Sequence, residues 1–124
     1  MYQQVTILGH LGGEPELRYT PSGTAVTTVS LATNKRNRDP QGNVTEDTTW
    51  WRVTCYGSKA ENLCQYANKG DLVYAVGELQ SDQTGNPRIY QVASGESRAN
   101  NEMKAFFVRS LAKNEQEDEE MPAW

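Results

Sequence analysis

Aromatic and basic side chains alternate in one short stretch near the middle of this 124-residue chain. Trp50, Arg52 and Tyr56 are even numbers of residues apart, so a β-strand would point all three to one face. Exposed aromatic rings stack on nucleobases, each stacked base contributing about 1–3 kcal/mol, and a guanidinium beside them can pair with a phosphate. The spacing favours a surface for single-stranded nucleic acid. The alternative is that Trp50 and Tyr56 face the core.

More basic residues lie on either side of this stretch. A cluster falls in the predicted loop between the second and third strands, at Lys35, Arg36 and Arg38. Lys59 and Lys69 follow the stretch, near the two ends of a predicted helix. Single-stranded nucleic acid binds in basic grooves that follow its phosphates, so all five are candidates for phosphate contacts. Taken alone, such a run is more simply explained as a solvated surface.

The sequence contains no catalytic or metal-binding pattern. His10 is the only histidine, and no nucleophile motif or spaced carboxylate pair accompanies it. Cys55 and Cys64 belong to no CxxC motif and no Cys/His cluster, so we expect no zinc site. We therefore expect a binding protein without cofactor or metal, not an enzyme.

The N-terminus resembles neither a signal peptide nor a transit peptide, and no run approaches the roughly 18 apolar residues of a membrane span. These features predict a cytoplasmic protein with no membrane partner. In that compartment we expect Cys55 and Cys64 to be reduced and to belong to the core.

The net charge of −4 is unevenly distributed. Residues 1–114 hold all 12 basic residues and 11 acidic ones, whereas residues 115–124 hold five acidic residues and no base. Such a charged run cannot bury enough apolar surface to order itself. The sequence predicts a near-neutral folded body, residues 1–111, followed by a short linker and a disordered acidic tail over residues 112–124.

Five segments have the β-branched and aromatic composition of strands: residues 2–11, 24–33, 48–56, 71–79 and 103–111. A helix is predicted after the third, because Ser58 and Glu61 fit a capping box and Gly70 fits a C-terminal cap. Its apolar stripe consists of Ala60, Leu63, Cys64 and Ala67. An all-β chain with one helix between strands three and four is typical of the OB-fold, a five-stranded Greek-key barrel that binds oligonucleotides or oligosaccharides.

Several runs, in order over residues 1–111, resemble the bacterial single-stranded DNA-binding proteins. The matching runs are Gly13-Glu14-Pro15-Glu16-Leu17-Arg18-Tyr19-Thr20-Pro21-Ser22-Gly23, Ala25-Val26, Ser30-Leu31-Ala32-Thr33-Asn34, Trp50-Trp51-Arg52-Val53, Tyr56-Gly57-Ser58-Lys59-Ala60-Glu61, Lys69-Gly70-Asp71-Leu72-Val73-Tyr74 and Gly77-Glu78-Leu79. The resemblance implies an OB-fold that binds single-stranded DNA without sequence preference in replication, recombination and repair, and that forms a homotetramer. It also implies an association with the bacterial nucleoid.

The resemblance also implies roles for individual residues. Trp50, Tyr56 and Tyr90 match aromatic positions on which bases stack, and Arg88 lies beside Tyr90 as a further cation. Asn37 stands where the family often has an aromatic, so Lys35, Arg36 and Arg38 would rely on phosphate contacts. Trp51 falls at a position that resembles a subunit contact. The long segment 80–102 suits a protruding hairpin with its tip near Ser94 and Gly95.

The tail resembles the acidic tip through which this family docks partner proteins. The predicted docking residues are Asp118, Glu119, Glu120, Met121, Pro122 and Trp124. The family normally ends in Pro-Phe, whereas this chain ends in Pro-Ala-Trp. The alternative is a merely solubilising end. For the whole chain two other functions remain open: a single-stranded RNA module, and an OB subunit that contacts protein alone.

Overall fold

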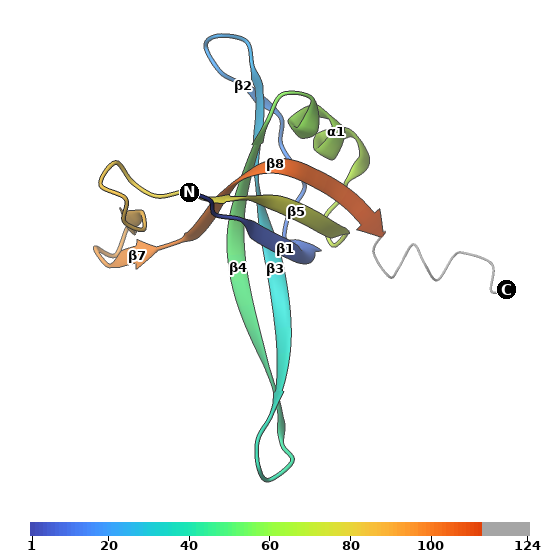
Figure 1. The fold of residues 1–124 in the computed structure, drawn as a ribbon, viewed down its shortest axis with the longest axis vertical. Helices are drawn as coiled ribbons and strands as arrows, with labels where there is room; N and C mark the ends of the chain where they lie inside the picture. The colour runs from blue at the N-terminus through green and yellow to red at the C-terminus, as the bar shows by residue number, and fades with distance from the viewer. Residues whose placement is uncertain (113–124) are drawn as a thin grey trace, which may run out of the picture.

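A computed structural model describes residues 1–112 of the chain. One helix, α1 (Ser58–Tyr66), accompanies a sheet that closes on itself. The strand order is β1-β5-β8-β4-β3-β2, and an additional β1–β3 pairing completes the barrel, with β4 and β8 running parallel. The predicted five-stranded OB barrel with one helix is thereby confirmed (Figure 1). The long strands are β1 (Val5–Leu11), β3 (Ala25–Arg38), β4 (Val44–Tyr56), β5 (Leu72–Leu79) and β8 (Asn101–Ala112).

Alternation along the barrel parts of β3 and β4 builds the core. Val29 and Leu31 of β3 and Val53 of β4 point inward and are nearly or fully buried. Thr27 is also fully buried, and its hydroxyl donates a hydrogen bond to the Glu16 carbonyl at 2.8 Å. The helix contributes Ala60 to the same core. Because inward residues are odd-numbered on both strands, the even-numbered side chains are left for the outer face.

The helix forms where predicted, but the expected caps are wrong. Ser58 is already the first helical residue, and Gly57 is the N-cap, with a φ of 71° that favours glycine and with no side-chain capping bond. At the other end the C-cap is Ala67, whose N–H donates to the Leu63 carbonyl at 3.0 Å. Gly70 lies beyond the helix, and its N–H donates to the Leu11 carbonyl at 2.8 Å.

The predicted loop between the second and third strands is instead a long β-hairpin arm. The β3–β4 ladder continues to the pair Arg38 and Val44, and only a short turn follows, closed by the Asp39 N–H on the Asn43 carbonyl at 2.9 Å. The arm leaves the barrel as a two-stranded ribbon (Figure 1). Its residues are polar because both of its faces meet solvent, so the sequence lacks the alternation that marks a half-buried strand.

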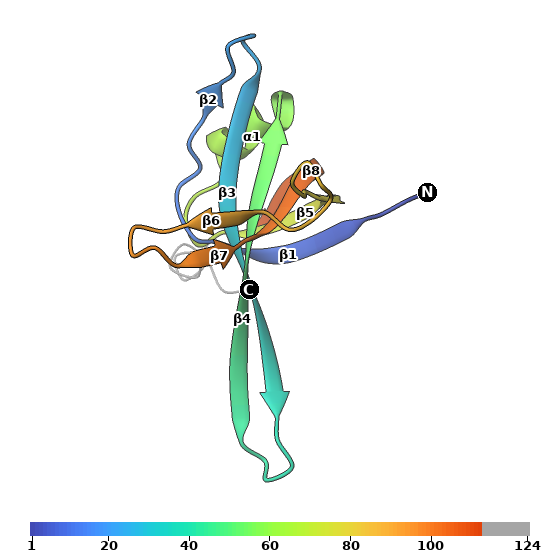
Figure 2. The same ribbon diagram turned by 90° about the vertical axis from the view of Figure 1, so that its left-hand side faces the viewer.

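Three short strands complete the fold: β2 (Arg18–Tyr19), β6 (Ile89–Gln91) and β7 (Ser97–Ala99). Strands β6 and β7 form a separate two-stranded sheet. Their turn is closed by the Val92 N–H on the Glu96 carbonyl at 2.9 Å, which agrees with a hairpin tip near Ser94 and Gly95. Figure 2 shows this hairpin, called here the 89–99 hairpin, projecting beside the barrel.

Gly77 is required where β5 meets β8. A Cβ at this position would lie 2.0 Å from the Lys104 carbonyl oxygen, at a register shift between the strands. We expect Gly77→Ala to lower the free energy of unfolding by about 1–3 kcal/mol, because the backbone must move apart. Denaturant unfolding measures this loss. Gly13→Ala is the control, since no atom lies within 4 Å of its Cβ position. Equal stability of the two variants would contradict the close approach.

The two cysteines are free thiols, as expected, and should differ in reactivity. Burial, with a smaller effect of Cys64, raises the pKa of the Cys55 thiol to about 11. At pH 8 Cys55 is therefore almost wholly the protonated thiol, which is the unreactive form. We expect the Cys64 thiol to react quickly with Ellman's reagent and the Cys55 thiol to react only as the chain unfolds. In Cys64→Ser the fast phase should vanish; a remaining fast phase would contradict the burial of Cys55.

Candidate nucleic-acid interface

Trp50, Arg52 and Tyr56 lie on the outer face of β4, as their spacing predicted. Trp50 is 54% exposed, Arg52 is exposed and Tyr56 is half-buried, whereas Val53 and Cys55 point inward. Across the β3–β4 ladder the partners of Trp50 and Arg52 are Ala32 and Ser30. These small side chains leave the Trp50 ring uncovered. The alternative, in which Trp50 faces the core, is wrong; its neighbour Trp51 packs there instead.

Trp50 is contacted at its main chain from β8 and at its ring by the chain after β1. Asn101 donates its side-chain N–H to the Trp50 carbonyl at 3.2 Å. Gly12 lies against the ring, since a Cβ on it would be 2.6 Å from Trp50 Cζ3. The absence of a side chain at Gly12 therefore gives the indole its place on the surface.

Two hollows share the Trp50 ring as a wall. The first is also lined by Gly12, Gly13, Glu14, Glu16 and Ser30. The second is lined by Ser30, Thr48, Thr49, Arg52, Asn100 and Asn101, among others. Carboxylates at the rim of the first repel phosphate, whereas the guanidinium at the second attracts it. The arrangement suits a single nucleic-acid strand whose bases contact the Trp50 ring and whose phosphates pass the hollow that Arg52 lines.

The other two aromatic rings each have a cation beside them. The Arg52 guanidinium lies 5.9 Å from the centre of the Tyr90 ring, which brings the 89–99 hairpin to the outer face of β4. Lys104 Nζ lies 5.3 Å from the centre of the Tyr56 ring. Sequence reasoning missed Lys104, because it reaches this face through the parallel β4–β8 pairing of Thr54 with Lys104. No local pattern reveals such a pairing.

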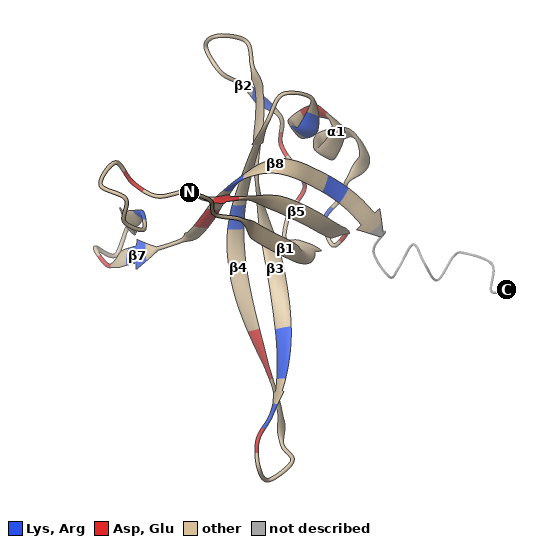
Figure 3. Ribbon diagram, in the orientation of Figure 1, with Lys and Arg blue, Asp and Glu red and all other residues tan. Residues whose placement is uncertain are grey.

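The basic residues of the arm divide between its two faces. Arg36 and Arg38 are even-numbered and share the pleat of Trp50, whereas Lys35 points to the opposite face. Glu46 pairs with Arg36 across the ladder, and Asp47 pairs with Lys35. Asn37 donates its side-chain N–H to Asp47 at 2.6 Å. The arm is therefore a ribbon of mixed charge and not a purely basic one, as Figure 3 shows.

The remaining predicted cations lie in two other places. Lys59 is in α1 and Lys69 follows it, at the helix side of the barrel, where the Lys69 N–H donates to Glu14 at 3.1 Å. Arg88 lies beside the 89–99 hairpin, with its Nη1 3.9 Å from Glu102. The predicted docking residues, Asp118, Glu119, Glu120, Met121, Pro122 and Trp124, lie outside the described residues.

Among residues 1–112 no group of three or more His, Cys, Asp or Glu side chains is placed to hold a metal ion. In the same part of the chain, no helix has both the length and the apolar character to cross a membrane.

Comparisons with known proteins show which family this chain resembles. Residues 2–111 match the model of the Single-strand binding protein family. A stretch of 80 residues, 64% of the chain, is 42% identical to single-stranded DNA-binding proteins of Xanthomonas campestris pv. campestris and Xanthomonas axonopodis pv. citri, and covers 46% and 44% of them. The chain thus spans about half the length of these relatives. A crystal structure of a deletion mutant of the single-stranded DNA binding protein from Thermus aquaticus matches with a TM-score of 0.66 at 28% identity, covering 87% of this chain and 49% of that one.

Proposed function

The chain belongs to the Single-strand binding protein family, and we propose that it binds single-stranded DNA without sequence preference. The observation that carries this proposal is the exposed Trp50 ring on the same strand face as Arg52 and Tyr56. Every base has a π-face, so stacking on such rings is tolerant of sequence. In a duplex the bases are already stacked and paired, and their faces are not available.

The proposed roles follow from where each side chain lies. Trp50, Tyr56 and Tyr90 stack on successive bases. Arg52 and Arg88, which lie near Tyr90, and Arg36 and Arg38, which lie further along the same face on the arm, neutralise phosphates. Lys104 joins this set beside Tyr56. Lys35, Lys59 and Lys69 are assigned peripheral phosphate contacts, since they lie on the far face of the arm or near the helix.

Fluorescence anisotropy with labelled oligonucleotides tests the function. We expect tight binding to oligo-dT, weaker binding to the RNA of matched sequence and negligible binding to the matched duplex. Equal binding to DNA and RNA would favour the RNA module. Binding to none of the three would favour an OB subunit that contacts only protein.

We also propose that the protein is a homotetramer. Leu8 and Phe107 are 52% and 45% exposed on the outer surface of β1 and β8. Tyr74 connects them, since it pairs with Leu8 and packs edge-on to the Phe107 ring at 6.0 Å. A row of apolar side chains across three strands is typical of a surface covered by another subunit. Sedimentation equilibrium measures the state, and Leu8→Asp should shift it towards smaller species. A wild-type monomer would contradict this proposal.

The acidic tail is proposed to recruit enzymes of replication, recombination and repair to DNA-bound protein in the bacterial cytoplasm and nucleoid. We also propose that its five acidic side chains, which follow the barrel closely in the sequence, compete with DNA for the basic side chains of the barrel. We expect a chain lacking residues 115–124 to bind oligo-dT more tightly than the full chain at low salt, and the difference to shrink as salt screens the charges. A tail with Gln and Asn in place of its acids is the control and should behave as the truncation does. Equal affinities at low salt would contradict this competition.

A further inference from the structure

The 89–99 hairpin needs side-chain contacts to hold its place beside the barrel. Strands β6 and β7 pair with each other in a sheet separate from the barrel sheet. Yet Tyr90 of this hairpin lies beside Arg52, on the face that carries Trp50. Whatever fixes the hairpin therefore also decides whether Tyr90 can take part in binding.

The contacts that fix it converge on Glu102 of β8. The Tyr90 hydroxyl donates to Glu102 Oε2 at 2.5 Å, and Arg88 Nη1 lies 3.9 Å from Oε1. Each oxygen of the carboxylate thus has its own partner near the hairpin. The Glu102 side chain is only 7% exposed, although Arg88 is 40% exposed. Arg88 also donates from Nε to the Ser81 carbonyl at 3.4 Å, which holds its guanidinium in this orientation.

A buried carboxylate is otherwise out of place at a surface for a polyanion. It costs desolvation free energy, and its charge opposes the approach of phosphates. Hydrogen bonds to a charged acceptor are stronger than those to a neutral one, and this makes a carboxylate a better anchor for a tyrosine hydroxyl than an amide would be.

We propose that Glu102 is a positioning residue for DNA binding. It holds Tyr90 and Arg88 in place. The Tyr90 ring then lies against Arg52 and, beside Trp50, faces the bound DNA strand. Glu102 itself does not touch the DNA. This inference rests on the proposed binding of single-stranded DNA, and it gives the 89–99 hairpin a defined part in that binding.

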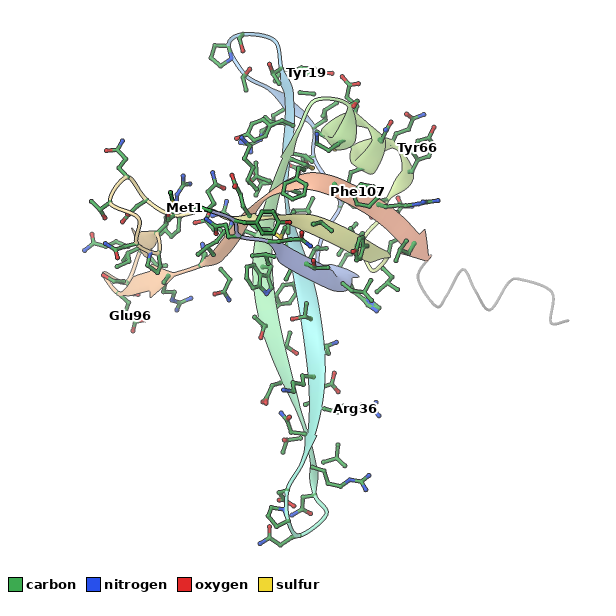
Figure 4. All side chains as sticks on the ribbon, in the orientation of Figure 1. Met1, Tyr19, Arg36, Tyr66, Glu96 and Phe107 are labelled. Carbon is green, nitrogen blue, oxygen red and sulfur yellow. The ribbon has the colours of Figure 1, made fainter. Side chains whose placement is uncertain are left out.

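The sign of the effect separates positioning from simple electrostatics. Glu102→Gln removes one negative charge, and charge alone would make oligo-dT bind more tightly. If Glu102 positions the hairpin, binding instead weakens, by about three- to tenfold for the loss of one charge-assisted contact. The matched control is Glu96→Gln, which removes one negative charge from the 89–99 hairpin itself, whereas Glu102 lies on the adjoining strand β8. Glu96 is 69% exposed and 3.7 Å from Arg98, and its side chain points away from the barrel (Figure 4). Glu96→Gln should bind equally or slightly more tightly.

A double-mutant cycle tests whether Glu102 acts through Tyr90. Tyr90→Phe keeps the ring and removes the hydroxyl that Glu102 accepts. We expect Tyr90→Phe to weaken binding, and Glu102→Gln, which also loses the ion pair with Arg88, to weaken it at least as much. The double variant should bind about as weakly as the weaker of the two single variants, because both substitutions disrupt the contact between Tyr90 and Glu102. Losses that multiply in the double variant would overturn the inference, as would tighter binding by Glu102→Gln.

A measurement on the free protein keeps the inference separate from the proposed function. In the wild type, the Tyr90 ring current should shift the Arg52 side-chain NMR signals, since the two groups lie 5.9 Å apart. The shift should collapse in Glu102→Gln and in Tyr90→Phe, but not in Glu96→Gln. A shift unchanged in both variants refutes positioning even if DNA binds. A shift that collapses in a protein that binds no oligo-dT leaves the hairpin contact intact but refutes the binding function and, with it, this role of Glu102.

Discussion

Trp50→Ala should weaken binding to oligo-dT by about 5- to 150-fold, the effect of losing one stacked base at about 1–3 kcal/mol. The loss should be similar for oligonucleotides of different sequence, because stacking uses the π-face that all bases share. Titration of labelled oligonucleotides with the variant measures both the size of the loss and its independence of sequence.

Two controls distinguish stacking from damage to the fold. Trp50 is 54% exposed, so its removal should change the midpoint of thermal unfolding far less than removal of a core residue. Trp50→Phe keeps an aromatic face and should recover most of the affinity. A Trp50→Ala protein that is folded and binds like the wild type would show that the strand does not stack on this ring.

The second large effect is expected from the arm. Arg36 and Arg38 share the pleat of Trp50, and Arg36 is labelled on the arm in Figure 4. For single strands each phosphate contact contributes about 0.7 to the slope of log affinity against log salt. Arg36→Ala with Arg38→Ala should therefore lower the slope by about 1.4 and weaken binding roughly ten- to a hundredfold at low salt.

Lys35→Ala provides the matched control for the arm. It removes one positive charge from the same arm, and it faces Asp47 across the ladder as Arg36 faces Glu46, but it lies on the opposite face. Its salt slope should change by much less than half of the change in the double variant. If Lys35→Ala lowers the slope as much as either arginine substitution does, the two faces of the arm contribute equally and the assignment of Arg36 and Arg38 is wrong.

The barrel could be predicted because its strands carry their own signal. Alternation in β3 and β4 marks an inner and an outer face, and this parity alone placed Trp50, Arg52 and Tyr56 together. The arm could not be predicted in the same way, since residues 34–47 meet solvent on both faces and look like a loop. The capping box failed because Gly57, with its positive φ, is the N-cap and Ser58 is already the first helical residue.

The site residues that could not be predicted from the sequence depend on contacts between distant segments. Lys104 and Glu102 enter it through the parallel pairing of β8 with β4, which joins residues about fifty positions apart in the sequence. Glu102 looks like an ordinary solvent-facing residue of a strand until the 89–99 hairpin covers it. Such residues are identified by the fold and not by local spacing.

Intrinsic tryptophan fluorescence tests the central claim most directly. The full chain carrying Trp124→Phe leaves Trp50 on the surface and Trp51 against the core as the two indoles. Titration with oligo-dT should quench the emission strongly, the matched duplex should leave it unchanged, and the further substitution Trp50→Phe should remove most of the quenching. If oligo-dT binds without quenching, or quenches equally after Trp50→Phe, the bases do not stack on Trp50 and the proposed interface is wrong.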